Sequence, residues 1–177
     1  MPTIQRIIVP DIRPPVSHYC HVTRAGPHVW VAGIVGQAQD GSIPADVVDQ
    51  FDVAITIMDK CLKAAGAGAE HVVKVQVFMT DIAERPKINP RRIAYFGDNL
   101  PVSTLVEVKG LVDPRMKVEI ECQAYVEEER ASMSIRSGSD REGRSLLTIR
   151  SVLHLQGPYA DVNKGLIQDI GGYRPLC

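Results

Sequence analysis

The clearest pattern of apolar and polar positions lies between Pro44 and Ala65, where apolar residues recur every three or four positions. The apolar set is Val47, Val48, Phe51, Ile55, Met58, Leu62 and Ala65. This spacing aligns the set along one side of an α-helix. We therefore expect a helix that begins at Ser42 or Pro44 and ends before Gly66, since glycine suits the end of a helix.

Runs of β-branched and alternating residues predict six strands around this helix. The runs are residues 4–9, 18–24, 28–36, 71–80, 103–108 and 117–126. Gly26 and Pro27 predict a turn that joins the second and third strands into a hairpin. A second, shorter helix is expected between residues 81 and 100, and we place its start near Pro90 because proline is favoured in the first turn of a helix.

The order of these elements predicts an α+β fold, with three strands, a helix, a strand, a shorter helix and two strands. The apolar stripes of both helices need a surface to cover, and one face of the sheet provides it. The other face is also rich in valine and isoleucine, as residues 72–79 show. Since two helices cover only one face, we expect other subunits to cover the second, which predicts an oligomer.

Composition narrows the class of protein. The chain has 177 residues, 45% of them hydrophobic, with a net charge of -1 and a pI of about 6.5. These values fit one globular domain and argue against the broad basic surface of a nucleic-acid-binding protein. The apolar runs are far shorter than the roughly 20 residues that cross a bilayer, and the N-terminal residues lack a signal-peptide pattern, so we expect a cytoplasmic protein without membrane contact.

The four cysteines are Cys20, Cys61, Cys122 and Cys177, and no two of them form a CxxC pair. This spacing favours reduced, mostly buried thiols.

The character of the chain changes after Val126, so we divide it into a domain of residues 1–126 and a C-terminal extension of residues 127–177. Residues 134–145, "SIRSGSDREGRS", are polar and charged and indicate a linker. Residues 145–155 are compatible with one more strand or a short helix. The extension has too few large apolar residues for a core of its own, and we expect it to be partly flexible or docked on the main domain.

Several motifs resemble those of the RidA family, also called the YjgF family, over residues 4–126. The motifs occur in the family's order and spacing: "SHYCHVTRAG", "VWVAGIVG", "CLKAAGAGAEHVVKVQVFMTDI", "AYFGDNLPVSTLVEV" and "VEIECQAYV". The resemblance implies a chorismate-mutase-like fold, with a six-stranded mixed sheet and two helices on one face. It also implies a homotrimer with a central β-barrel and clefts between subunits that bind small metabolites.

The activity implied by the resemblance is hydrolysis of reactive enamines and imines, such as 2-aminoacrylate, to 2-keto acids and ammonia. Neither a metal nor an organic cofactor is implied. The family's pocket tyrosine corresponds to Tyr19, its glycine in "SGQ" to Gly33, its asparagine before the second helix to Asn89, and the glutamate of "EIE" to Glu119. We therefore expect Glu119 to be catalytic and the other three to contact the substrate.

Ser103 is the main departure from the family, because it stands where deaminating members have an arginine that holds the substrate carboxylate. A guanidinium grips a carboxylate through two parallel charge-assisted hydrogen bonds, whereas serine offers one neutral donor. Losing that grip costs on the order of a few kcal/mol, or roughly a hundredfold in affinity. Arg91, Arg92 and Arg115 are possible substitutes, and of these we favour Arg115; a solvated helix face is the simpler interpretation of Arg91 and Arg92.

Each candidate also has a structural interpretation. Glu119 is compatible with a solvent-facing position on its strand, Tyr19 with an interface position, and Asn89 with a helix cap. His18, Cys20 and His21 invite a metal-site interpretation, but strand alternation sends His21 to the other face.

Three functions stay open from sequence. The first is an enamine or imine hydrolase with a non-standard substrate preference. The second is a non-catalytic trimer that binds a small metabolite or a partner. The third is an endoribonuclease, which the lack of a basic surface disfavours.

Overall fold

The computed structural model describes residues 3–127, 132–139 and 145–152. The chain divides into two compact units, residues 1–128 and residues 129–177, and each is described by itself. Within the described residues, no helix has the length and apolar character needed to span a membrane.

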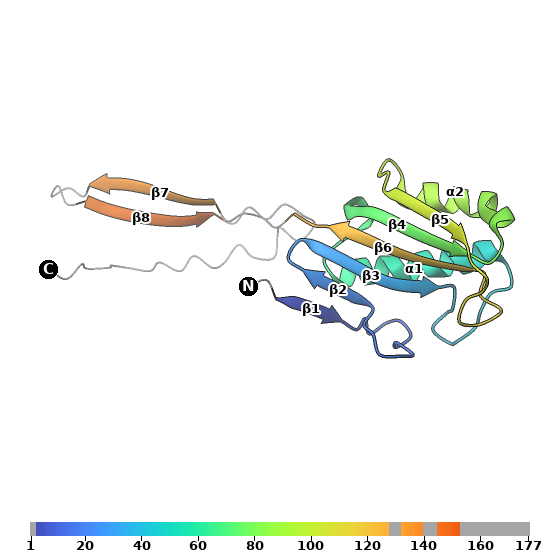
Figure 1. The fold of residues 1–177 in the computed structure, drawn as a ribbon. Coiled ribbons are helices and arrows are strands. Elements are labelled where there is room, and N and C mark those ends of the chain that lie inside the picture. Colours follow the sequence, from blue (N-terminus) through green and yellow to red (C-terminus); the bar gives the residue numbers. More distant parts are fainter. Residues whose placement is uncertain (1–2, 128–131, 140–144, 153–177) are drawn as a thin grey trace. The chain divides into compact units, whose positions relative to one another are not determined.

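The first unit is a six-stranded mixed sheet with two helices on one face, as the sequence predicted (Figure 1). The strands are β1 (Ile4–Ile7), β2 (Val22–Ala25), β3 (His28–Val35), β4 (Val72–Met79), β5 (Val102–Glu107) and β6 (Val118–Tyr125). Their order in the sheet is β1-β2-β3-β6-β4-β5. Only the pair of β4 and β5 is parallel, which leaves β5 at the free edge next to the strand that precedes it in the chain.

The helices α1 (Val47–Ala64) and α2 (Arg85–Phe96) pack side by side behind the sheet in Figure 1. Alternation along the strands separates the two faces: in β6, Val118, Ile120, Cys122 and Ala124 are buried against the helices. From α1, Phe51, Met58 and Leu62 complete this core, and all three are fully buried. The apolar stripe predicted for the first helix therefore forms the core contact.

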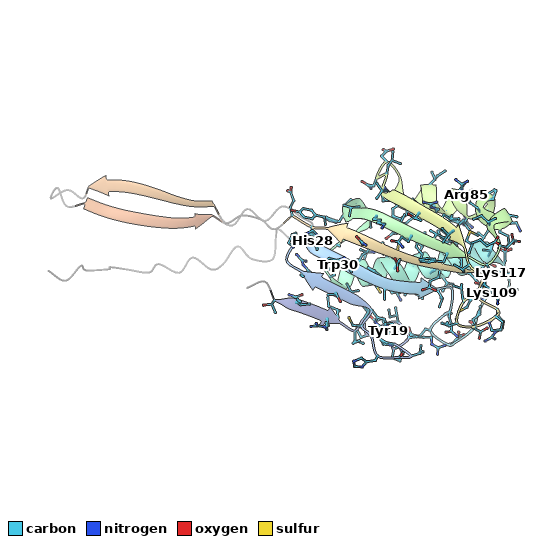
Figure 2. All side chains as sticks on the ribbon, viewed as in Figure 1. Tyr19, His28, Trp30, Arg85, Lys109 and Lys117 are labelled. Carbon is cyan, nitrogen blue, oxygen red and sulfur yellow. The ribbon has the colours of Figure 1, made fainter. Side chains whose placement is uncertain are left out.

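The other face of the sheet carries the alternate residues and has no helix on it. In β6 these are Glu119, Glu121, Gln123 and Tyr125. Trp30 on β3 and Tyr125 are more than two-fifths exposed, and His28 stacks on Trp30 at 5.6 Å between ring centroids (Figure 2). We call this helix-free face the open face. It is a mixture of apolar and acidic side chains, less uniformly apolar than the sequence suggested.

Three predicted boundaries were wrong. The helix α1 begins after Asp46, whose side chain accepts a hydrogen bond from the N–H of Val48 at 2.8 Å and so caps the first turn. The helix α2 begins at Arg85 rather than near Pro90, with Pro86 in its first turn. The strand β2 begins at Val22 rather than His18, because residues 16–18 and 21 form bends and residues 19–20 are irregular.

The second unit contains a two-stranded antiparallel sheet of β7 (Ser132–Ser139) and β8 (Ser145–Val152). The prediction of a linker over residues 134–145 was wrong for residues 134–139, which lie in β7, and for Ser145, which begins β8; residues 140–144 lie outside the described residues. In the register of this sheet, Ile135 pairs with Ile149. The alternation of small polar and apolar residues in β7 was the sequence pattern that indicated a strand here. Residues 153–155, part of the stretch predicted to be a strand or short helix, lie outside the described residues.

Candidate active site

The predicted catalytic residue, Glu119, lies on the open face near the start of β6. Its strand neighbours in the register are Val35 of β3 and Phe78 of β4, so two strands flank it. Burial raises the pKa of the Glu119 carboxyl, and the nearby charge of Glu121 adds to the effect. Among residues 3–127, no side chain or backbone group forms a hydrogen bond or an ion pair with this carboxylate.

Gly33 lies directly beneath this carboxylate. The pairing of β3 with β6 shifts between Val31 and Ile34, which marks a β-bulge around the glycine. A Cβ added at Gly33 would overlap Oε1 of Glu119 and lie 2.9 Å from its Cδ. The structure therefore brings together two of the residues predicted from sequence, and the absence of a side chain at Gly33 is what makes room for the carboxylate.

A carboxylate of this kind is suited to proton transfer. It is partly removed from water, its pKa is raised above its ordinary value, and the described protein groups leave its oxygens without a hydrogen-bond partner. Such a group can accept a proton from water in one step and return it in the next.

Gln50 holds the beginning of β6 in place, and the sequence analysis did not identify it. Its side chain is fully buried. The amide nitrogen donates to the carbonyl oxygens of Pro44 at 2.7 Å and Arg115 at 2.8 Å, and the amide oxygen accepts from the N–H of Lys117 at 2.7 Å. All of these bonds involve the side-chain amide, so Gln50 fixes the backbone two residues before Glu119. The sequence feature that could have indicated this role is a glutamine directly before Phe51, a residue of the apolar stripe.

Ser103 lies on the opposite side of the sheet from Glu119. It pairs with Val75, which is fully buried against the helices, whereas the partners of Glu119 lie on the open face. Its hydroxyl accepts a hydrogen bond of 2.7 Å from Nη2 of Arg92 on α2. Arg92 is partly buried, and this burial lowers the pKa of its guanidinium, so the prediction of a solvated helix face holds only in part for this residue. One chain by itself does not bring Ser103 and Glu119 to a common site.

Arg115, which was predicted to take the place of the family's carboxylate-binding arginine, is engaged within its own loop. Its Nε lies 3.0 Å from Oδ1 of Asp113, and its Nη2 lies 2.8 Å from Oδ2. This paired guanidinium holds the pKa of Asp113 at about 2. A substrate carboxylate would have to displace Asp113 to use Arg115, which weakens its case as a substrate-binding residue.

The remaining predicted contacts lie at two different places. Tyr19 is in the loop before β2 and is half exposed (Figure 2). Asn89 is partly buried in the fifth position of α2, so its interpretation as a helix cap was wrong; Glu84 occupies the cap position. No described hydrogen bond ties either side chain to Glu119.

The histidine and cysteine cluster is structural. His21 is buried, its Nδ1 accepts from the N–H of Val9 at 2.9 Å, and its Nε2 lies 3.0 Å from the carbonyl oxygen of Arg13, to which it donates. These two bonds use both ring nitrogens. Within the part of the chain that the structure describes, no group of three or more His, Cys, Asp or Glu side chains is arranged to hold a metal ion.

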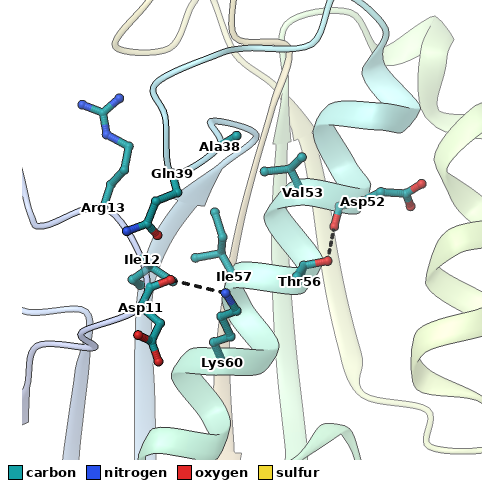
Figure 3. Close-up of a pocket in the computed structure, with 10 residues that line it drawn as sticks. All are labelled: Asp11, Ile12, Arg13, Ala38, Gln39, Asp52, Val53, Thr56, Ile57 and Lys60. Carbon is teal, nitrogen blue, oxygen red and sulfur yellow. Dashed lines mark hydrogen bonds between the residues drawn. The ribbon is translucent and has the colours of Figure 1, made fainter.

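A hollow of about 310 Å³ lies elsewhere, between α1 and residues 11–13 and 38–39 (Figure 3). Its walls include Ile57, Thr56 and Lys60 of α1, and Lys60 donates to the carbonyl oxygen of Asp11 at 3.3 Å. None of the residues predicted for the active site lines it.

Comparison with known proteins identifies related chains. A family model described as Endoribonuclease L-PSP matches residues 11–126. The 3-aminoacrylate deaminase RutC of Acinetobacter baylyi is 30% identical over 125 residues, which cover 69% of this chain and 98% of the relative. A 2-iminobutanoate/2-iminopropanoate deaminase of Mus musculus is 28% identical over 129 residues, covering 70% of this chain and 94% of the relative.

Solved structures share the fold of this chain. The crystal structure of the YjgF gene product from E. coli superposes with a TM-score of 0.64 at 25% identity, covering 68% of this chain and 98% of that one.

Proposed function

Because the chain belongs to the endoribonuclease L-PSP family, which includes the RidA and YjgF proteins, we propose that it hydrolyses reactive enamines or imines to carbonyl compounds and ammonia. The observation that carries the proposal is the half-buried Glu119 carboxylate, held over Gly33 with a raised pKa and no described partner. Relatives named as 3-aminoacrylate and 2-iminobutanoate deaminases support the same class of reaction.

In the proposed reaction, water adds to the carbon of the C=N bond while Glu119 takes one of its protons. The imine nitrogen takes a proton from solvent, giving a neutral carbinolamine with one C–O and one C–N bond, and the hydroxyl proton released in the next step returns to solvent. Glu119 then returns its proton to the amine nitrogen, the C–N bond breaks, and the hydroxyl proton is lost as the carbonyl forms. The sum is imine plus water giving a carbonyl compound and ammonia, with Glu119 regenerated.

We further propose that the working form is a homotrimer in which the open faces of three sheets meet. Trp30, Val106 and Tyr125 support this, because each is at least two-fifths exposed and stands on the face that no helix covers. Burial of such a face in an assembly also deepens the burial of Glu119. Light scattering coupled to size-exclusion chromatography measures the mass of the assembly directly.

The test of activity is a competition between the protein and semicarbazide for imines made in situ. An amino-acid oxidase generates 2-imino acids, an amine oxidase generates imines without a carboxylate, and semicarbazone formation is followed by absorbance. We expect the protein to lower the yield of at least one semicarbazone in proportion to its concentration. Equal yields with and without protein across the panel, combined with binding of 2-keto acids, would instead support a non-catalytic metabolite-binding trimer.

A further inference from the structure

The cations of α2 fall into two groups. Lys87 is 2.8 Å from Oε1 of Glu84, and Nε of Arg91 is 3.0 Å from Oδ2 of Asp52, so both are neutralised by a neighbouring carboxylate. Arg85 and Arg92 have no acidic partner among residues 3–127. They lie seven positions apart, about two helical turns, and so on the same side of α2, and the charge of Arg85 acts on Arg92. Figure 2 labels Arg85 on this helix.

The uncompensated charge is concentrated beside Ser103. The guanidinium of Arg92 is partly buried, and its Nε is buried without a hydrogen-bond partner in the described structure. Holding a partly buried cation without a counter-ion is costly, which makes this arginine a candidate for a functional site. An anion is the ligand that would compensate its charge. Nη2 reaches Ser103, which is itself exposed, so the charged end of the side chain lies at the surface and not in the core.

The hydrogen bond between these two residues leaves a donor free. Ser103 accepts from Arg92 through Oγ, so its own hydroxyl proton remains available. A carboxylate placed here receives the remaining N–H groups at the end of Arg92 and the O–H of Ser103. The carboxyl of Asp113, held by the guanidinium of Arg115 through two bonds, shows the same pairing elsewhere in this chain.

We propose that Arg92 and Ser103 together form the carboxylate-binding site of this protein, with Arg85 contributing long-range charge. Ser103 then does not abolish carboxylate binding, because it accepts a hydrogen bond from the arginine that α2 supplies and adds a hydroxyl donor. The assignment of this carboxylate to a substrate rests on the proposed function, whereas the binding site itself does not.

The position of the site sets one geometric condition. Ser103 lies on β5, one of the two edge strands of the sheet, and on the side opposite to Glu119. A substrate that touches both groups therefore lies between two copies of the chain, one giving Arg92 and Ser103 and the other giving Glu119.

Binding is tested first without any turnover, by calorimetric titration of the full-length protein with sodium pyruvate as the probe carboxylate. We expect Arg92→Gln to weaken binding by roughly tenfold to a hundredfold, and Ser103→Ala by roughly threefold to tenfold, because the first removes a charged donor and the second a neutral one. Arg91→Gln is the matched control, since Arg91 is already paired with Asp52. The affinity of this variant for pyruvate should equal that of the wild type. Arg92→Lys keeps the charge, so its affinity for pyruvate should lie between that of the wild type and that of Arg92→Gln.

Kinetics then separate this inference from the proposed function. In the semicarbazide competition assay, Arg92→Gln should raise KM for a carboxylate-bearing imine at least tenfold and leave KM for an uncharged imine unchanged. Pyruvate binding that depends on Arg92 without any hydrolysis sustains the site and defeats the hydrolase proposal. Absence of pyruvate binding to the wild type, equal affinities for wild type and Arg92→Gln, or hydrolysis with an unchanged KM in Arg92→Gln, overturns the site and leaves the hydrolase proposal standing.

Discussion

The carboxylate of Glu119 lies so close above Gly33 that no other residue fits beneath it without moving one of the two. The relationship links two motifs that are more than eighty residues apart in sequence, because β3 and β6 are neighbours in the sheet. It also explains why a glycine stands in the interior of a strand, where it otherwise weakens packing.

Replacing Gly33 with alanine should therefore reduce activity with little effect on folding. The new Cβ overlaps the end of a flexible side chain, so the carboxylate moves aside by about an ångström, a displacement that can cost roughly a hundredfold in rate. The measurement is kcat/KM together with the melting temperature. Gly110→Ala is the control, since a Cβ there meets nothing within 4 Å, and both parameters should match the wild type. Full activity in Gly33→Ala contradicts the assigned geometry.

Replacing Glu119 with glutamine should make the protein more stable at neutral pH. Burial raises the pKa of this carboxyl above its ordinary value of 4.5, so its contribution to stability is present below pH 4.5 and is lost as the pH rises through the raised value. Glutamine has no charge to desolvate. Thermal melts should show Glu119→Gln above the wild type at pH 7 and level with it at pH 4. A lower melting temperature at pH 7 would mean that the carboxylate has a stabilising partner.

Gln50→Leu should destabilise the fold strongly. The substitution keeps the size of the side chain but leaves the N–H of Lys117 and the carbonyl oxygens of Pro44 and Arg115 without their partner. Each buried group left unpaired costs about 1–3 kcal/mol, so the free energy of unfolding should fall by at least about 3 kcal/mol. Urea denaturation measures the free energy of unfolding. The control is Gln5→Ala at an exposed position of β1, whose free energy of unfolding should stay within about 0.5 kcal/mol of the wild type. Equal stability of Gln50→Leu and the wild type would show that this network is dispensable.

The buried thiols should be unreactive in the native protein. Burial raises the pKa of Cys61 and of Cys122 to about 12, so neither forms a thiolate near pH 8, and the thiolate is the reactive species. In the double variant Cys20→Ser and Cys177→Ser, a thiol reagent should label neither cysteine before denaturation and both after it. Rapid labelling of the native variant would show that the core between α1 and β6 opens readily.

The order of elements and the α+β class could be predicted because the signals are local and strong. The stripe from Val47 to Ala65 has a clear helical period, and the apolar run that forms β4 has almost no competing interpretation. The start of α2 could not be placed in the same way, since Pro86 and Pro90 both suit a first turn and the helix is mostly polar. Asp46 was missed as the cap of α1 because Ser42 and Pro44 offered competing starts.

The site was harder to predict for a different reason. Gly33 and Glu119 were identified through the resemblance to a family, but their contact depends on strand order and on a bulge that no local pattern announces. The meeting of Arg92 with Ser103 depends on how α2 is rotated against the edge of the sheet, which sequence spacing alone does not fix. The pairing of Arg115 with Asp113 is local, two residues apart, and was open to prediction.

The most direct test of the central claim compares two carboxylates that stand two residues apart on the same face of β6. The quantity measured is kcat for the imine that is hydrolysed fastest in the competition assay, and it is compared among the wild type, Glu119→Gln and Glu121→Gln. We predict that Glu119→Gln lowers kcat by roughly 10²–10⁴-fold, the usual contribution of a general acid–base group, while Glu121→Gln stays within about threefold of the wild type. Retained turnover in Glu119→Gln, or an equal loss in both variants, would contradict the assignment of Glu119 as the catalytic group.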